Sequence, residues 1–129
     1  MIIEDKPHCT LEYDPALKCV IQTWKGFAGS DNFRGSILKT IEVFEQREAQ
    51  SIISNTQNSK VVSPADAGWV AEYANPILIS HGLRKLAFIV PENVFARRSV
   101  DHFLGETKGQ ALATQYFADL AAARAWVSE

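Results

Sequence analysis

The sequence predicts an α/β domain with a mixed, mostly parallel sheet of about five strands and four helices, in the order ββαβαβαβα. Two observations carry this prediction. Apolar residues alternate with a period of two near the start of the chain and recur at helical spacing in the segments between the later strands. The segment 86–90, Leu-Ala-Phe-Ile-Val, is wholly apolar, as in a strand that is covered on both faces. Strands that are separated by helices pair in parallel through crossover connections.

The first two strands are expected at 8–13 and 17–24, because buried-type and polar side chains alternate there. Between them the sequence Asp14-Pro15 favours a turn, since Asp accepts hydrogen bonds from the backbone ahead and Pro fixes its own φ. The second of these strands carries apolar residues on both faces, which indicates that both faces are covered.

The two cysteines lie in these two strands. A turn at 14–16 places Cys9 opposite Ile21 rather than opposite Cys19. The two cysteines are then farther apart than a disulfide usually spans. We therefore expect both thiols to be small, buried and unpaired.

A first helix is expected at about 30–48, with Ser30 as its N-cap and Asp31 in its first turn, where a negative charge is favoured. A short strand at 51–55 and a polar loop at 56–60 follow. The stripe that the helix buries recurs at helical spacing and consists of Phe33, Ile37, Ile41 and Phe44.

The next helix begins with Ser63 at the cap, Pro64 in the first turn and Asp66 three positions after the cap. Pro76 lies inside its apolar pattern and should kink the helix, because it removes a backbone donor. Gly82 is the expected stop.

The strand at 86–90 is expected to be central. A third helix is expected at 93–104, a last strand at 112–117, and a final helix that begins after an N-cap at Asp119.

The chain has 129 residues, of which 47% are hydrophobic and 22% charged, so one domain is expected, at 8–127, with residues 1–7 as an N-terminal tail. With 13 Lys and Arg against 15 Asp and Glu, the net charge is -2, which argues against a nucleic-acid-binding domain. No apolar run approaches the ~20 residues that cross a bilayer, and residues 1–7 lack the apolar core of a signal peptide. A cytoplasmic protein is therefore expected.

Four stretches of the chain, in their order and spacing, carry a resemblance to a known family: 13–15 leading into 23–27, 62–66 with Trp69, 90–95 with 99–100, and 115–117 with Trp126. Together with the order of the elements, they resemble the SpoIIAA-like branch of the STAS fold (sulfate transporter and anti-sigma-factor antagonist), a branch that is often joined to CRAL-TRIO lipid-binding proteins. The resemblance implies a non-catalytic regulatory or protein-interaction domain.

The resemblance also implies a candidate phosphosite. Anti-sigma-factor antagonists switch partners when a serine at the start of the second helix is phosphorylated, and the residue that matches by position is Ser63. The typical motif has Asp before the serine and small residues after it, whereas this chain has Val62 and Pro64. The residues themselves favour a structural role for Ser63, as a helix cap.

No constellation of catalytic or metal-binding residues stands out. The chain lacks a Gly-x-Ser-x-Gly elbow, a phosphate loop and a dinucleotide fingerprint. His8, His81 and His102 are interpreted as surface or capping residues, and the scattered Cys and His give no zinc spacing. We expect no catalytic residue, no metal and no cofactor.

An alternative function follows from the surplus of large aromatic residues. These side chains either pack in the core or line an apolar pocket or groove. The resemblance to CRAL-TRIO proteins implies that such a pocket accepts a lipid or another small apolar ligand. The residues concerned are Trp24, Phe27, Trp69, Phe95 and Phe103.

Two further partners stay open at this point. Arg97 and Arg98, with Arg84 and Lys85, form either a site for an anion or lipid headgroup at a membrane surface or a set of solvated charges. Exposed aromatic residues on a small α/β domain also make a homodimer plausible, beside a protein partner of another kind.

Overall fold

The computed structural model describes residues 1–26, 28–59, 63–91 and 112–129. Within them one six-stranded sheet runs in the order β1-β2-β3-β4-β5-β6. The first three strands pair antiparallel and the last four pair parallel. The strands are β1 (Ile2–Lys6), β2 (Cys9–Asp14), β3 (Cys19–Gly26), β4 (Ser51–Ser59), β5 (Lys85–Ile89) and β6 (Ala113–Phe117).

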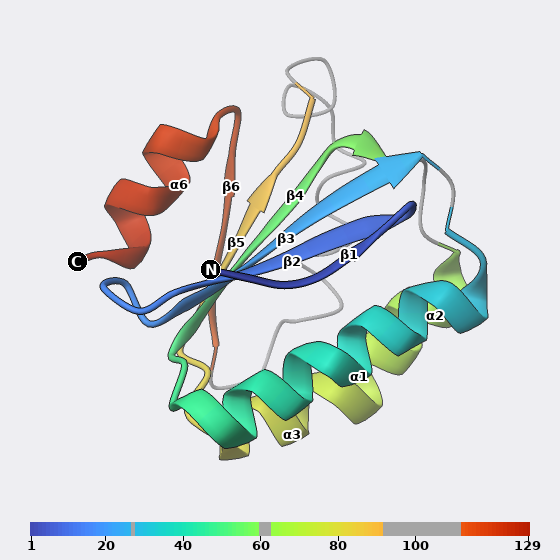
Figure 1. Cartoon of the computed structure of the whole chain (residues 1–129), viewed down its shortest axis with the longest axis horizontal. Helices are drawn as coiled ribbons and strands as arrows, with labels where there is room; N and C mark the ends of the chain where they lie inside the picture. The colour runs from blue at the N-terminus through green and yellow to red at the C-terminus, as the bar shows by residue number, and fades with distance from the viewer. Residues whose placement is uncertain (27, 60–62, 92–111) are drawn as a thin grey trace.

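The described helices cover the two faces of this sheet (Figure 1). One face carries α1 (Ser30–Arg47) beside a second helix that is continuous through α2 (Pro64–Trp69), the π-helical η1 (Val70–Ala74) and α3 (Asn75–Ser80). The opposite face carries α6 (Leu120–Val127). None of these helices is long and apolar enough to cross a membrane.

The predicted fold class is therefore confirmed as mixed α/β, with different numbers of elements. The sheet has six strands where about five were expected, and the described residues hold three helices where four were expected. The helix expected at 93–104 lies outside the described residues. The apolar strand β5 pairs in parallel with a strand on each side, as predicted for an interior strand.

The expected N-terminal tail is wrong, because most of residues 1–7 form the edge strand β1. Met1 and Tyr13 exchange backbone hydrogen bonds, and Thr10 Oγ1 donates to Asp5 Oδ1 at 2.8 Å. The charged side chains of this segment, which was expected to be a tail, are typical of an edge strand, where they discourage pairing with another chain. The polar loop expected at 56–60 is wrong as well, because β4 continues to Ser59.

The register of the β2–β3 hairpin also differs from the prediction. Cys9 lies opposite Trp24, and Asp14 lies opposite Cys19. Asp14 Oδ1 accepts hydrogen bonds from two backbone N–H groups of the turn, and Lys18 closes it with a φ of 52°, so the turn is longer than expected.

Both cysteines are free and buried, as predicted. Cys9 belongs to the core between the sheet and α1, whereas Cys19 belongs to the core beneath α6, so the sheet separates them. Burial raises the pKa of Cys9 to about 12 and that of Cys19 to about 11. Both thiols are thus held in their protonated, unreactive form.

A chain of hydrogen bonds crosses the core between the sheet and α1. Gln22 Nε2 donates to Thr40 Oγ1 at 3.0 Å, and Thr40 Oγ1 donates in turn to the carbonyl of Ser36. The Trp24 indole N–H donates to Gln22 Oε1 and to Ser54 Oγ, at 3.3 and 3.1 Å. These buried polar groups satisfy one another, and they fix how α1 lies on β3 and β4.

The C-terminal helix is attached to the sheet by polar contacts as well as by its apolar face. Asp119 caps it as predicted, accepting from Ala122 N at 2.8 Å. Arg124 Nη2 donates to Asp14 Oδ2 at 2.7 Å, and Lys85 Nζ donates to the carbonyl of Trp126 at 2.9 Å.

Candidate functional site

A cluster of polar and aromatic side chains lies where strands of the sheet end and the next helices begin. β3 ends at Gly26 and α1 begins at Ser30, and β4 ends at Ser59 before α2 begins at Pro64. The two helix starts therefore meet beyond the carboxyl ends of parallel strands, the edge at which α/β proteins place their sites.

Asp66 is the centre of this cluster and is only 4% exposed. Its Oδ2 accepts from Ser30 Oγ at 2.9 Å, and its Oδ1 accepts from Arg34 Nε at 3.0 Å. Its backbone N–H donates to Ser63 Oγ at 3.1 Å. One carboxylate thus ties the first turn of α2 to the first two turns of α1.

The ionisation of Asp66 follows from these contacts. Burial by itself would raise the pKa of Asp66, but hydrogen bonds with Ser30, Arg34 and Ser63, together with the charge of Arg34, outweigh it and hold the pKa below its ordinary value. The carboxylate is therefore charged at neutral pH, and it keeps Arg34 in place.

Arg34 connects the buried carboxylate to aromatic residues that reach the surface. Its guanidinium carbon lies 4.9 Å from the centroid of the Trp69 ring, and that ring stacks on Tyr73 with centroids 5.3 Å apart. Tyr73 is 48% exposed, and Leu38, one helical turn after Arg34 on α1, is also exposed. We call Arg34, Trp69 and Tyr73 the aromatic ladder.

The π-helical segment η1 supports the outer end of the ladder. The N–H of Asn75 donates to the carbonyl of Val70, five residues earlier, and Tyr73 lies inside this wider turn. The sequence predicted a kink at Pro76; the structure places a π segment directly before it, where Pro76 removes the donor that Glu72 would otherwise receive. Such segments occur often at functional sites.

The predicted cap residues had different outcomes. Ser63 is the N-cap of α2, as expected, and its side chain is exposed apart from the bond to Asp66. Ser30 was expected to cap α1, but Gly29 holds that position, and the Ser30 hydroxyl bonds Asp66 instead. Nothing in the structure tests phosphorylation of Ser63, which stays a prediction.

The residues expected to form an apolar pocket are separated in the structure. Trp24 is buried in the core, where it stacks on Phe33 with centroids 5.1 Å apart. Trp69 packs at the edge of the same core and supports the ladder. Phe27, Phe95 and Phe103 lie outside the described residues, so a pocket formed with them stays a prediction.

The expected cationic patch is also only partly described, because Arg97 and Arg98 lie outside the described residues. Lys85 is used internally, since its ammonium lies 5.2 Å from the centroid of the Trp126 ring and bonds the end of α6. Arg84 is exposed at the start of β5.

Two histidines have structural partners. His8 lies in the β1–β2 turn, with Nε2 2.9 Å from Ser36 Oγ, and His81 follows α3 and lies 3.5 Å from Glu45. In the part of the chain that the structure describes, no group of three or more Cys, His, Asp or Glu residues could hold a metal ion.

Sequence reasoning missed Arg34 and Tyr73. Tyr73 belongs to the apolar pattern of the second helix, yet it is exposed. The available signal was the helical spacing itself: Trp69 and Tyr73 are four residues apart, so their side chains meet on one helix face.

Neither a protein-family model nor a curated protein matches this sequence. A chain in the crystal structure of the diguanylate cyclase SiaD in complex with its activator SiaC from Pseudomonas aeruginosa has a similar fold, with a TM-score of 0.56 and 7% identity. The similarity covers 90% of this chain and 97% of that chain. At this identity the likeness shows the fold alone.

Proposed function

We propose that this protein is a non-catalytic regulatory or protein-interaction domain of the SpoIIAA-like STAS type, and that its partner docks on the aromatic ladder. The observation that carries the proposal is a stack in which the exposed Tyr73 and the half-buried Trp69 and Arg34 rest on a buried carboxylate. Tyr, Trp and Arg are the residue types that dominate binding energy at protein interfaces.

The ladder is held in its binding geometry before any partner arrives. Asp66 holds Arg34, Arg34 lies on the face of Trp69, and Trp69 stacks on Tyr73. A pre-organised surface loses little side-chain entropy on association, so more of its contact energy contributes to affinity. The related fold found in the complex of SiaD with its activator is consistent with a role in protein assembly.

Phosphorylation of Ser63 would regulate the same surface. The Ser63 hydroxyl lies beside Asp66, whose carboxylate already binds Arg34. A phosphoryl group there would add about two negative charges and would compete with Asp66 for the guanidinium, which would draw Arg34 from the face of Trp69.

A pair of variants tests the docking surface. We expect Trp69→Ala with Tyr73→Ala to lose the partner that the wild-type protein retains from a lysate of its source, with affinity lower by at least about 30-fold, or about 2 kcal/mol. Leu120→Ala is the matched control, because Leu120 is an exposed apolar residue on α6, across the sheet. Retention of the same partners by the double variant, with its circular dichroism unchanged, would reject the ladder as the docking surface.

A further inference from the structure

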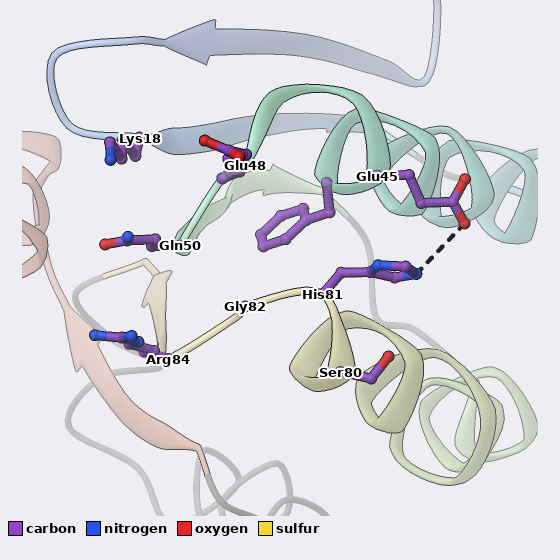
Figure 2. A pocket seen from close by; sticks show the side chains of 10 residues that line it. Lys18, Glu45, Glu48, Gln50, Ser80, His81, Gly82 and Arg84 are labelled. Carbon is purple, nitrogen blue, oxygen red and sulfur yellow. Dashed lines mark ion pairs between the residues drawn. The ribbon is translucent and has the colours of Figure 1, made fainter.

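A pocket of about 490 Å³ lies at the edge of the sheet away from the ladder, where α1 and α3 end and β4 and β5 begin (Figure 2). Its walls come from four segments: the β2–β3 turn, the end of α1 with the loop after it, the end of α3, and the start of β5. This size is within the range of small-molecule sites.

The rim of the pocket is built from unusual backbone conformations. Lys18 and Glu48 have φ values of 52° and 55°, in the left-handed region, and Gly82 has a φ of 110°. Non-glycine residues seldom adopt this region, and such residues cluster at ligand sites. The rim is also tied across the sheet: Gln50 N donates to Lys18 O at 2.7 Å, and Arg84 N donates to Gln50 O at 2.8 Å.

These backbone bonds place Lys18, Gln50 and Arg84 next to one another in a row. Figure 2 shows their side chains on the same side of the pocket, pointing away from α1 and α3. Among the described residues, neither Lys18 nor Arg84 forms an ion pair. Two cations with an amide between them offer several donors to one carboxylate.

Two carboxylates also border the pocket. Glu48 follows the last turn of α1 and lies beside Lys18, and Glu45 lies above His81, with its Oε1 3.5 Å from His81 Nε2 (Figure 2). The carboxyl ends of α1 and α3, where the helix dipoles are negative, lie beside them. These negative groups favour an ammonium group. Phe44 and Ala49, both almost fully buried, provide an apolar floor.

We propose that this pocket binds a small zwitterion of the amino-acid or dipeptide class. The ligand's carboxylate lies against Lys18, Gln50 and Arg84, its ammonium group faces Glu48 and the end of α1, and its apolar side chain rests on the floor. The lining favours a zwitterion over a simple anion, because Glu48, which forms no ion pair among the described residues, would repel an anion. The site lies away from the ladder and does not depend on the proposed docking function.

Titration of ¹⁵N-labelled protein with L-leucine, followed by NMR, tests the proposal. We expect saturable shifts of the amide signals around the pocket with a Kd of about 1 mM, as for a small ligand at an open site. Isocaproate, which lacks the ammonium group, and isoamylamine, which lacks the carboxylate, should each bind at least about tenfold more weakly.

The variants Arg84→Gln and Glu48→Gln should each weaken leucine binding by about tenfold. Lys39→Gln, which removes a half-buried cation that pairs with Glu42 on α1 outside the pocket, should leave binding unchanged. The same spectra report whether each variant is folded. Absence of saturable shifts in the wild-type protein, equal binding of all three probes, or equal binding by Arg84→Gln and Lys39→Gln would overturn the proposal.

Discussion

Replacement of Asp66 by Asn is expected to lower the free energy of unfolding by about 2–3 kcal/mol at pH 7. The two oxygens of the carboxylate accept from Ser30 Oγ and from Arg34 Nε. The carboxamide keeps one acceptor oxygen, but its N–H₂ group faces the other of these two donors. The loss is smaller than for a fully buried ion pair, because the Arg34 side chain is 37% exposed and regains water. Denaturation by urea measures it.

The effect of Asp66 should depend on pH with a defined sign. Its pKa is lower in the folded protein than in the unfolded chain, so its contribution is complete above the unfolded value of about 3.9 and is lost as the pH falls through the folded value. The difference in stability between the wild-type protein and Asp66→Asn should therefore be constant from about pH 7 to pH 5 and shrink below about pH 4.

Asp31→Asn is the matched control for this prediction. It makes the same chemical change in an exposed residue of the first turn of α1 and should cost no more than about 1 kcal/mol. Equal stabilities of the two variants at pH 7 would contradict the role given to Asp66.

Phe44→Ala is expected to have the largest effect on stability, about 3–5 kcal/mol. The Phe44 side chain is 2% exposed and fills the core between α1 and the sheet, so truncation removes apolar burial and leaves a cavity. This is a large part of the about 5–15 kcal/mol that stabilises an ordinary domain.

The matched control is Phe44→Leu, which keeps much of the volume and should cost less than half as much. Urea midpoints measure both changes, and the slopes should stay equal if the transition stays two-state. A loss below about 1 kcal/mol for Phe44→Ala would show that this end of α1 does not pack as described.

The sequence predicted those elements whose pattern is local. In α1 the helical spacing of the apolar residues from Phe33 to Phe44 indicates which face is buried. In β5 the unbroken apolar run likewise indicates a strand in the interior of the sheet. The strand β1 was not predicted, because its charged residues are typical of an edge strand and obscure the alternation of apolar and polar residues. The register of the β2–β3 hairpin was predicted wrongly, because the left-handed conformation of Lys18 lengthens the turn.

The candidate site was predictable only in part. Ser63 and Asp66 were found, since a cap and an acid in the first turn of a helix form a local signal. Their link to Arg34 was not, because the ion pair spans 32 residues of sequence and exists only once α1 and α2 lie side by side. Tyr73 lies in the π segment, whose wider turn shifts side chains relative to an α-helical pattern.

Photo-crosslinking from the ladder itself tests most directly whether this surface binds a protein. With p-benzoylphenylalanine in place of Tyr73, irradiation in a cell lysate should give one dominant protein adduct, and the same group in place of Leu120 on α6 should not give it. No adduct from position 73, or identical adducts from both positions, would contradict the account.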